Sequence, residues 1–232
     1  MKKIAIGMML ILGMATSGWA TTYSEYTYSD ASGRSAVADF ALDGTTLTLL
    51  LTNNSTSAVP NPTFILTALL FNTSSSLTAL SAVLPSGSTV ITSAGTLYPA
   101  GTNVGSQWAY NSHGVSSAGL GVFGPGDVIG GPDLTSSGGN PPDGLPYGIV
   151  GTGTINFGNG DLGNAQLIQN SVLFTFTTDG SFTLADISDV LFQYGTTLGG
   201  YPPSTVPEPG TLLLLGGGLL SLAFFRRSRM NR

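Results

Sequence analysis

The spacing of apolar residues along the middle of the chain is the feature that most limits its fold. Apolar side chains recur at every second position or in short runs, and the runs at 47–52 and 64–71 are each followed by Asn and then Ser or Thr. Val172, Phe174 and Phe176 alternate with other residues, which places them on one face of a strand. Between the two ends of the chain no window has the period of a helix. The sequence therefore predicts strands closed by turns.

These patterns predict an all-β fold. Strands are predicted at 47–52, 64–71, 172–177, 23–28, 36–42, 88–93, 107–110, 147–151 and 188–194. Thr178-Asp179-Gly180 is predicted to be a tight turn that joins 172–177 to a short strand at 182–184 in a hairpin. Many short strands without the spacing of βαβ units favour a two-layer antiparallel β-sandwich, which we expect over residues 21–200.

Charge is scarce in this chain, and its placement is informative. Charged residues make up 8% of the chain, against roughly 25% in a typical soluble domain, while 41% of residues are hydrophobic and can build a core. Arg34 is the only Lys or Arg in 21–205, a stretch that carries eleven carboxylates. Such a surface repels phosphate backbones, which excludes nucleic-acid binding, and attracts divalent cations. The absence of cysteine excludes disulfides, thiolate nucleophiles and Cys-ligated metal sites.

The N-terminus has the three parts of a signal peptide. Lys2 and Lys3 form a positive start, and residues 4–15 form an apolar run that is too short to span a bilayer. Small residues then precede a cleavage site. We predict a signal peptide over 1–20, cut by signal peptidase after Ala20, with cleavage after Ser17 as the alternative.

The C-terminus also has three parts. Residues 201–210 form a stiff Pro-rich spacer, 211–225 are uncharged and apolar, and 226–232 are a basic cytoplasmic stop. The apolar part is predicted to be a transmembrane helix, although its fifteen residues reach only about 22 Å, short of a hydrocarbon core of roughly 30 Å. An uncleaved single-span anchor is the alternative. The residues that define the two flanking parts are Val206, Pro207, Glu208 and Pro209 in the spacer and Arg226, Arg227 and Arg229 in the stop.

This tail resembles the PEP-CTERM sorting signal of exopolysaccharide-producing Gram-negative bacteria. The resemblance implies recognition by exosortase, a membrane-embedded cysteine-type transpeptidase that would cleave near the Pro-Glu-Pro element. It also implies export through an inner-membrane intermediate to the cell surface or extracellular matrix, with association to exopolysaccharide or biofilm. Gly210 stands where the family usually has Ser or Ala after the second Pro.

The middle of the chain has a second resemblance, to one group of exosortase-dependent surface proteins. That group has no assigned biochemical activity, so this resemblance implies surface display and nothing catalytic. Its landmarks are spread over most of residues 40–198, at 47–55, 64–71, 107–110, 143–149 and 192–196.

Nothing in the sequence marks a catalytic centre. His113 is the only histidine, and a hydrolase triad would need a Ser and a carboxylate beside it. The stretch from Gly114 to Gly119 lacks the spacing of a nucleophile elbow. No recognisable motif marks a pair of carboxylates for glycoside hydrolysis. We therefore expect a non-enzymatic protein and no cofactor other than possible calcium, with a secreted hydrolase as the least favoured function.

Residues 111–146 are predicted to be a long loop, because they hold ten Gly and five Pro. Calcium prefers oxygen ligands on flexible turns, and its predicted ligands are Asp127, Asp133, Asp143 and Asp161. Asp is also an ordinary turn residue, which is the alternative. Sugar stacking is a second hypothesis, based on Trp108, Tyr110, Tyr147, Tyr194 and Tyr201, with core packing as its alternative. A calcium- or carbohydrate-binding surface module is thus the alternative function.

Overall fold

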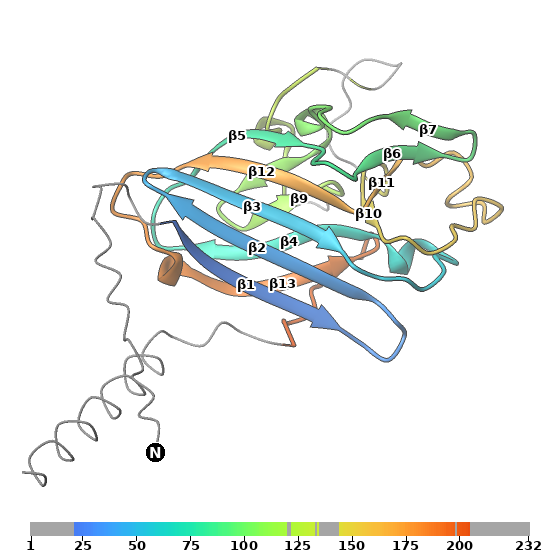
Figure 1. The fold of residues 1–232 in the computed structure, drawn as a ribbon, viewed down its shortest axis with the longest axis horizontal. Coiled ribbons are helices and arrows are strands. Elements are labelled where there is room, and N and C mark those ends of the chain that lie inside the picture. Colours follow the sequence, from blue (N-terminus) through green and yellow to red (C-terminus); the bar gives the residue numbers. More distant parts are fainter. Residues whose placement is uncertain (1–20, 120–121, 133, 135–143, 198, 205–232) are drawn as a thin grey trace, which may run out of the picture.

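The computed structural model describes residues 21–204 apart from 120–121, 133, 135–143 and 198 (Figure 1). The predicted signal peptide, with its cleavage site at Ala20, and the predicted sorting tail from 205 onward lie outside the described residues. Within the described residues the regular structure is β-strand with short 3-10 helices and no α-helix, and no helix there could cross a membrane. The all-β prediction is confirmed.

The described strands form two sheets, which we call the first and second sheets. The first sheet has the order β1 (Thr22–Ser29), β2 (Ser35–Asp43), β3 (Thr46–Asn53), β12 (Ser171–Thr177) and β5 (Thr78–Val83). Each neighbouring pair is antiparallel. Burial alternates along these strands, so that Leu47, Leu49 and Leu51 are buried while Thr48 and Leu50 are partly exposed on the other face. One face of the first sheet therefore meets the core and the other meets solvent.

The second sheet has the order β7 (Gly95–Tyr98), β6 (Thr89–Thr92), β11 (Leu167–Gln169), β10 (Ile149–Val150), β4 (Leu66–Thr73), β9 (Gly114–Ser116) and β8 (Ala109–Asn111), with β13 (Ile187–Tyr194) also paired to β4. β10 and β11 are parallel. This pair corrects the prediction of a wholly antiparallel fold. Parallel neighbours need a long crossover, and residues 151–166 between the two strands provide it.

Aromatic side chains fill the space between the two sheets. Figure 1 shows β1, β2 and β3 of the first sheet in front of β4 and β13 of the second. The rings of Phe40 and Phe71 meet edge to face at 5.4 Å, and those of Trp108 and Phe174 at 5.0 Å. Phe40 and Phe71 join β2 of the first sheet to β4 of the second, while Trp108, directly before β8, packs on β12 of the first. Such pairs contribute about 0.5–1.5 kcal/mol each beyond the burial of their area.

The predicted hairpin after β12 is wrong. β12 has β3 on one side and β5 on the other, so no edge remains for a strand at 182–184. Thr178 donates its backbone N–H to the carbonyl of Thr45 at 2.9 Å, and the chain then leaves the first sheet. It passes through the 3-10 helix η4 (Leu184–Asp186) and enters the second sheet as β13.

The described part of the Gly-rich segment 111–146 contains β9 and the 3-10 helix η3 (Pro125–Asp127), which corrects the prediction of one long loop. Gly114 starts β9 with φ 122°, and a Cβ there would collide with the backbone of Leu69 and Leu70. Glycine thus lets β9 approach β4 closely. The sequence also gave no signal for three other short strands, β5, β7 and β11. Two more 3-10 helices are η1 (Pro62–Phe64) and η2 (Gly105–Gln107).

Candidate functional site

The last described residues, Tyr201–Ser204, lie against both sheets, and we call this segment the C-terminal clasp. Tyr201 and Phe192 of β13 exchange two backbone hydrogen bonds of 2.8 Å. Ser204 donates its backbone N–H to the carbonyl of Thr27 on β1 at 2.6 Å. β1 is the terminal strand of the first sheet, and β13 belongs to the second. We call the two sheets and their connections, within residues 21–204, the body. The clasp therefore joins the two sheets at the point where the chain leaves the body.

Arg34 holds the clasp from the side. Its guanidinium carbon lies 4.4 Å from the ring centre of Tyr201 and 5.3 Å from that of Tyr194. Its Nη1 donates to the hydroxyl of Tyr201 at 3.1 Å. Its Nη2 lies 2.5 Å from the carboxylate of Asp30, which also accepts a bond of 2.6 Å from the hydroxyl of Tyr28. Arg34, the only Lys or Arg of residues 21–205, thus contacts the chain at the point where it leaves the body.

Asp30 keeps its charge in this arrangement. Burial alone would raise the pKa of Asp30, but hydrogen bonds from Ser32, Tyr28 and Arg34 outweigh it, so that its pKa lies well below the usual range. Burial and the hydrogen bond to Asp30 also raise the pKa of Tyr28, which keeps that hydroxyl protonated as a donor. The ion pair therefore persists from mildly acidic to alkaline pH.

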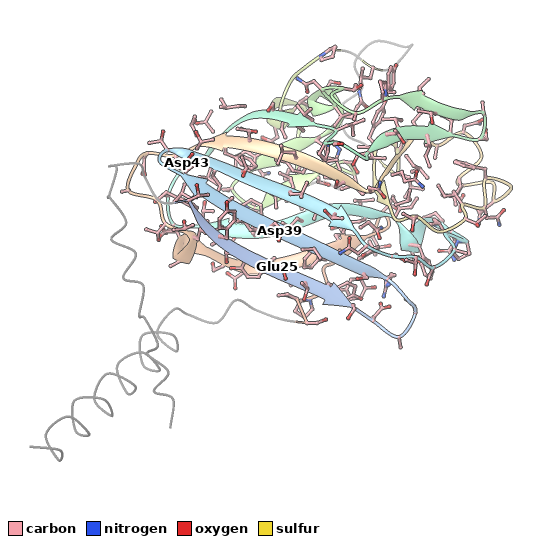
Figure 2. The ribbon with its side chains drawn as sticks, viewed as in Figure 1. Glu25, Asp39 and Asp43 are labelled. Carbon is pink, nitrogen blue, oxygen red and sulfur yellow. The ribbon has the colours of Figure 1, made fainter. Side chains whose placement is uncertain are left out.

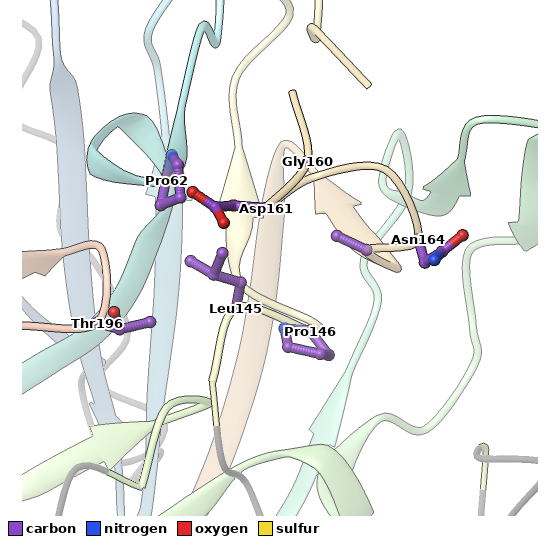
Figure 3. A pocket seen from close by; sticks show the side chains of 8 residues that line it. Pro62, Leu145, Pro146, Gly160, Asp161, Asn164 and Thr196 are labelled. Atoms are coloured by element: carbon purple, nitrogen blue, oxygen red, sulfur yellow. The ribbon is translucent and has the colours of Figure 1, made fainter. Parts of the chain in front are cut away.

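An open pocket of about 590 Å³ lies beside the loop that leads into β11 (Figure 3). Asp161, Asn164 and Thr196 supply its polar side chains, and all three are exposed. Its other lining residues are Pro62, Leu145, Pro146, Gly160 and Ala165. The pocket therefore combines one carboxylate and neutral polar groups with apolar walls.

Local turns fix the loop that carries Asp161. Asn159 accepts two backbone hydrogen bonds, one from Asp161 to its side-chain oxygen at 3.0 Å and one from Leu162 to its carbonyl at 2.9 Å. The amide of Asn159 also donates to the carbonyl of Pro60 at 3.1 Å. Leu162 is fully buried in a second, smaller apolar cluster. The carboxylate of Asp161 is thus presented from a loop with an apolar anchor.

The predicted calcium ligands have different places. Asp127 caps η3, where its carboxylate accepts the backbone N–H of Gly124 at 2.7 Å, and Asp161 lines the pocket. Asp133 and Asp143 lie outside the described residues. Among the residues that the structure does describe, no three His, Cys, Asp or Glu side chains gather closely enough to hold a metal ion. The calcium site stays a prediction.

The other predicted chemistry has a mixed outcome. His113 is exposed in the turn between β8 and β9, and its backbone N–H donates to the side chain of Asn111 at 2.9 Å. Of the aromatic residues considered for sugar stacking, Trp108, Tyr147 and Tyr194 are buried in the core. Core packing is therefore the correct interpretation for these three.

A pair of carboxylates that sequence reasoning missed lies on the outward face of the first sheet. Glu25 and Asp39 face each other across β1 and β2, and Asp43 lies further along β2 (Figure 2). Burial, followed by the charge of Glu25, raises the pKa of Asp39. Both residues lie in predicted strands, at 23–28 and 36–42, but only the pairing register places them opposite each other.

A model of the PEP-CTERM protein-sorting motif matches residues 205–228, directly after the clasp. The chain carries a PEP-CTERM sorting motif. The motif implies an exosortase-dependent surface protein, which is exported and passes through a membrane-anchored intermediate before display. No curated protein and no solved structure matches the chain. The resemblance of residues 40–198 to one group of surface proteins therefore stays a prediction.

Proposed function

We propose that this chain is a non-enzymatic surface protein which exosortase processes at the PEP-CTERM motif and which then associates with exopolysaccharide in the extracellular matrix. The observation that carries this proposal is the sorting motif at 205–228, which begins directly after Ser204 of the C-terminal clasp on an all-β body. In this assignment Val206, Pro207, Glu208 and Pro209 form the recognised element, the apolar residues after them engage the membrane, and Arg226, Arg227 and Arg229 fix the topology.

The body offers support for a role in a hydrated polymer matrix. Between the predicted signal peptide and the motif it carries eleven carboxylates and a single cation, which is itself paired with Asp30. Like charge of this excess keeps separate copies apart and soluble outside the cell. The outward face of the first sheet presents hydroxyl side chains, among them Thr46, Thr48 and Thr175, together with the carboxylates described above and apolar side chains such as Leu50. Its hydroxyl groups suit weak contacts with sugars.

Substitution in the motif tests the sorting step. We expect Glu208→Gln, combined with Pro207→Ala, to leave the chain in the inner membrane of an exosortase-positive host, because the recognised element is lost. Glu25→Gln is the matched control, since it removes a carboxylate from the body and leaves the motif intact. Fractionation followed by immunoblotting measures the distribution. Surface display of the motif variant at the level of the control would contradict the proposal.

A second function, carbohydrate binding, is favoured by the pocket at Asp161. Its volume falls within the range of small-molecule sites, which is roughly 300–1,000 Å³. Asp161, Asn164 and Thr196 offer hydrogen-bond partners for hydroxyl groups, while Leu145 and Pro146 offer an apolar surface for the C–H groups of a sugar ring.

Calorimetric titration with oligosaccharides of the host exopolysaccharide tests this second function. Asp161→Ala should weaken binding about tenfold or more, because a hydrogen bond to a charged group contributes about 1.5–3 kcal/mol. Asp179→Ala is the control, since Asp179 is exposed in a turn outside the pocket. Equal affinities for the two variants, or no heat with any oligosaccharide, would remove this candidate. The same titration with calcium chloride tests the predicted calcium site.

A further inference from the structure

The chain leaves the folded body at a fixed point. Ser204 makes three hydrogen bonds to β1. Its N–H donates to the carbonyl of Thr27 at 2.6 Å, its hydroxyl oxygen accepts the N–H of Ser29 at 3.0 Å, and its hydroxyl donates to the carbonyl of Ser29 at 3.3 Å. Together with the pairing of Tyr201 and Phe192, these bonds place the last described residue on the edge of the first sheet.

The tether between this point and the sorting element is short. Pro207 is three residues beyond Ser204, and Pro209 is five residues beyond it. An extended chain spans at most about 3.6 Å per residue, so these prolines lie within about 11 Å and 18 Å of the exit point. β2 alone has nine residues and is about 30 Å long. The body is thus larger than its tether.

We propose that exosortase contacts the folded body itself, on the surface around the clasp, while the Pro-Glu-Pro element occupies its active site. We call this surface the exit face, and it comprises residues 29–34 and 201–204. The inference rests on the proposed processing by exosortase. The tether lets the sorting element lie at most about 18 Å from the exit point. A membrane-embedded enzyme that holds this element must therefore contact the body.

The charge of the exit face suits an approach to a membrane surface. The body as a whole is strongly acidic and would be repelled by anionic lipid. The exit face is different, because its only charged side chains, Asp30 and Arg34, form an ion pair. Ala31 and Ser32 in the same turn are exposed and uncharged. The one cation of the body therefore lies where the body must come closest to the membrane.

The closed clasp is what keeps the tether short. Release of the clasp would lengthen the tether and let the body move away from the enzyme. It would also give up the backbone pairing of Tyr201 with Phe192, the hydrogen bonds of Ser204 and the contact between Arg34 and the ring of Tyr201. These contacts come from β1, β13 and the turn between β1 and β2, so the clasp is held from three directions.

Site-specific labelling tests the inference, because the chain has no cysteine of its own. Ala31→Cys places a thiol on the exit face, and Ala94→Cys places one in the exposed turn between β6 and β7, at the far end of the second sheet. Each full-length chain is labelled with a large maleimide–polyethylene glycol and reconstituted with exosortase in lipid vesicles. We expect the label at position 31 to slow processing at least tenfold and the label at position 94 to leave it unchanged. Equal rates for the two labelled chains would overturn the inference.

A second arm uses the length of the tether. A flexible Gly/Ser insertion of about 12 residues after Ser204 adds roughly 20 Å of reach and should restore processing of the chain labelled at position 31. Failure of the insertion to restore it would also overturn the inference, because the block would then not depend on a short tether. If the unlabelled parent is not processed at all, the proposed function fails together with the inference. Near-ultraviolet circular dichroism of each labelled chain checks that the body is folded.

Discussion

The contact between Arg34 and Tyr201 yields the sharpest prediction for stability. We consider a double-mutant cycle of Arg34→Gln and Tyr201→Leu, which removes the guanidinium and the phenol ring separately and together. In the folded chain the guanidinium carbon lies 4.4 Å from the ring centre, and Nη1 donates to the phenol oxygen at 3.1 Å. Only 14% of the Arg34 side chain is exposed, so water screens this contact weakly.

The size of the coupling follows from these two contacts. A cation over an aromatic ring contributes about 0.5–1 kcal/mol at an exposed site, and a hydrogen bond from a charged donor contributes about 1.5–3 kcal/mol. Tyr201 is 38% exposed, which favours the lower end of both ranges. We therefore predict a coupling free energy of about 1.5–2.5 kcal/mol between the two positions.

Urea unfolding of the full chain in mild detergent, followed by the fluorescence of buried Trp108, measures the four free energies of unfolding. The control cycle pairs Arg34→Gln with Tyr110→Leu, whose ring contacts Phe176 instead of the clasp. Those two changes should be additive within about 0.5 kcal/mol. A coupling between Arg34 and Tyr201 that is no larger than this control would refute the assignment of Arg34 as the residue that holds the clasp.

Three further predictions concern the body. The pKa of Asp39 is raised in the folded state. Between the pKa values of the unfolded and folded states, the folded chain therefore holds a proton on Asp39 that the unfolded chain has lost. The free energy of unfolding falls as pH rises through this interval. Glu25→Gln should raise the free energy of unfolding at neutral pH by about 0.2–1 kcal/mol and show a smaller gain near about pH 4, as urea titrations at both pH values will test. Gly114→Ala should lower the free energy of unfolding more than Gly87→Ala does. Both glycines have a positive φ, but only at Gly114 would the new Cβ collide with backbone atoms. Thermal unfolding of the two variants compares them. Phe174→Ala should cost about 3–5 kcal/mol in urea unfolding, because the ring is fully buried between the sheets.

The strands with clear alternation were predictable from the sequence, and their arrangement was not. The residues of β3 and β12 alternate between buried and more exposed side chains and end in turn residues. The local pattern was therefore sufficient to predict both strands. The partners of β12 are β3 and β5, which lie far from it in the sequence, and no local signal separates that pairing from the predicted hairpin. Short strands such as β11 exist because neighbours on both sides complete their hydrogen bonds, which a three-residue pattern cannot reveal.

The candidate site likewise has one part that was predictable from the sequence and one part that was not. The sorting motif was predictable because it is a continuous stretch, with prolines, an apolar run and arginines in order. The clasp was not, because Arg34 and Tyr201 are 167 residues apart in the sequence. The sequence drew attention to both, one as the single cation of the body and the other as an aromatic residue at the start of the Pro-rich spacer. Only the packing of β1 against β13 brings them together.

The most direct test of the central claim is the intact mass of the protein purified from its native host, with and without exosortase. We predict that the residues beyond the Pro-Glu-Pro element are lost only in the strain with exosortase, and that the N-terminal residues up to Ala20 are lost in both. A protein that keeps its C-terminal residues in the exosortase-positive strain would contradict processing by exosortase, because the tail would then be a plain membrane anchor.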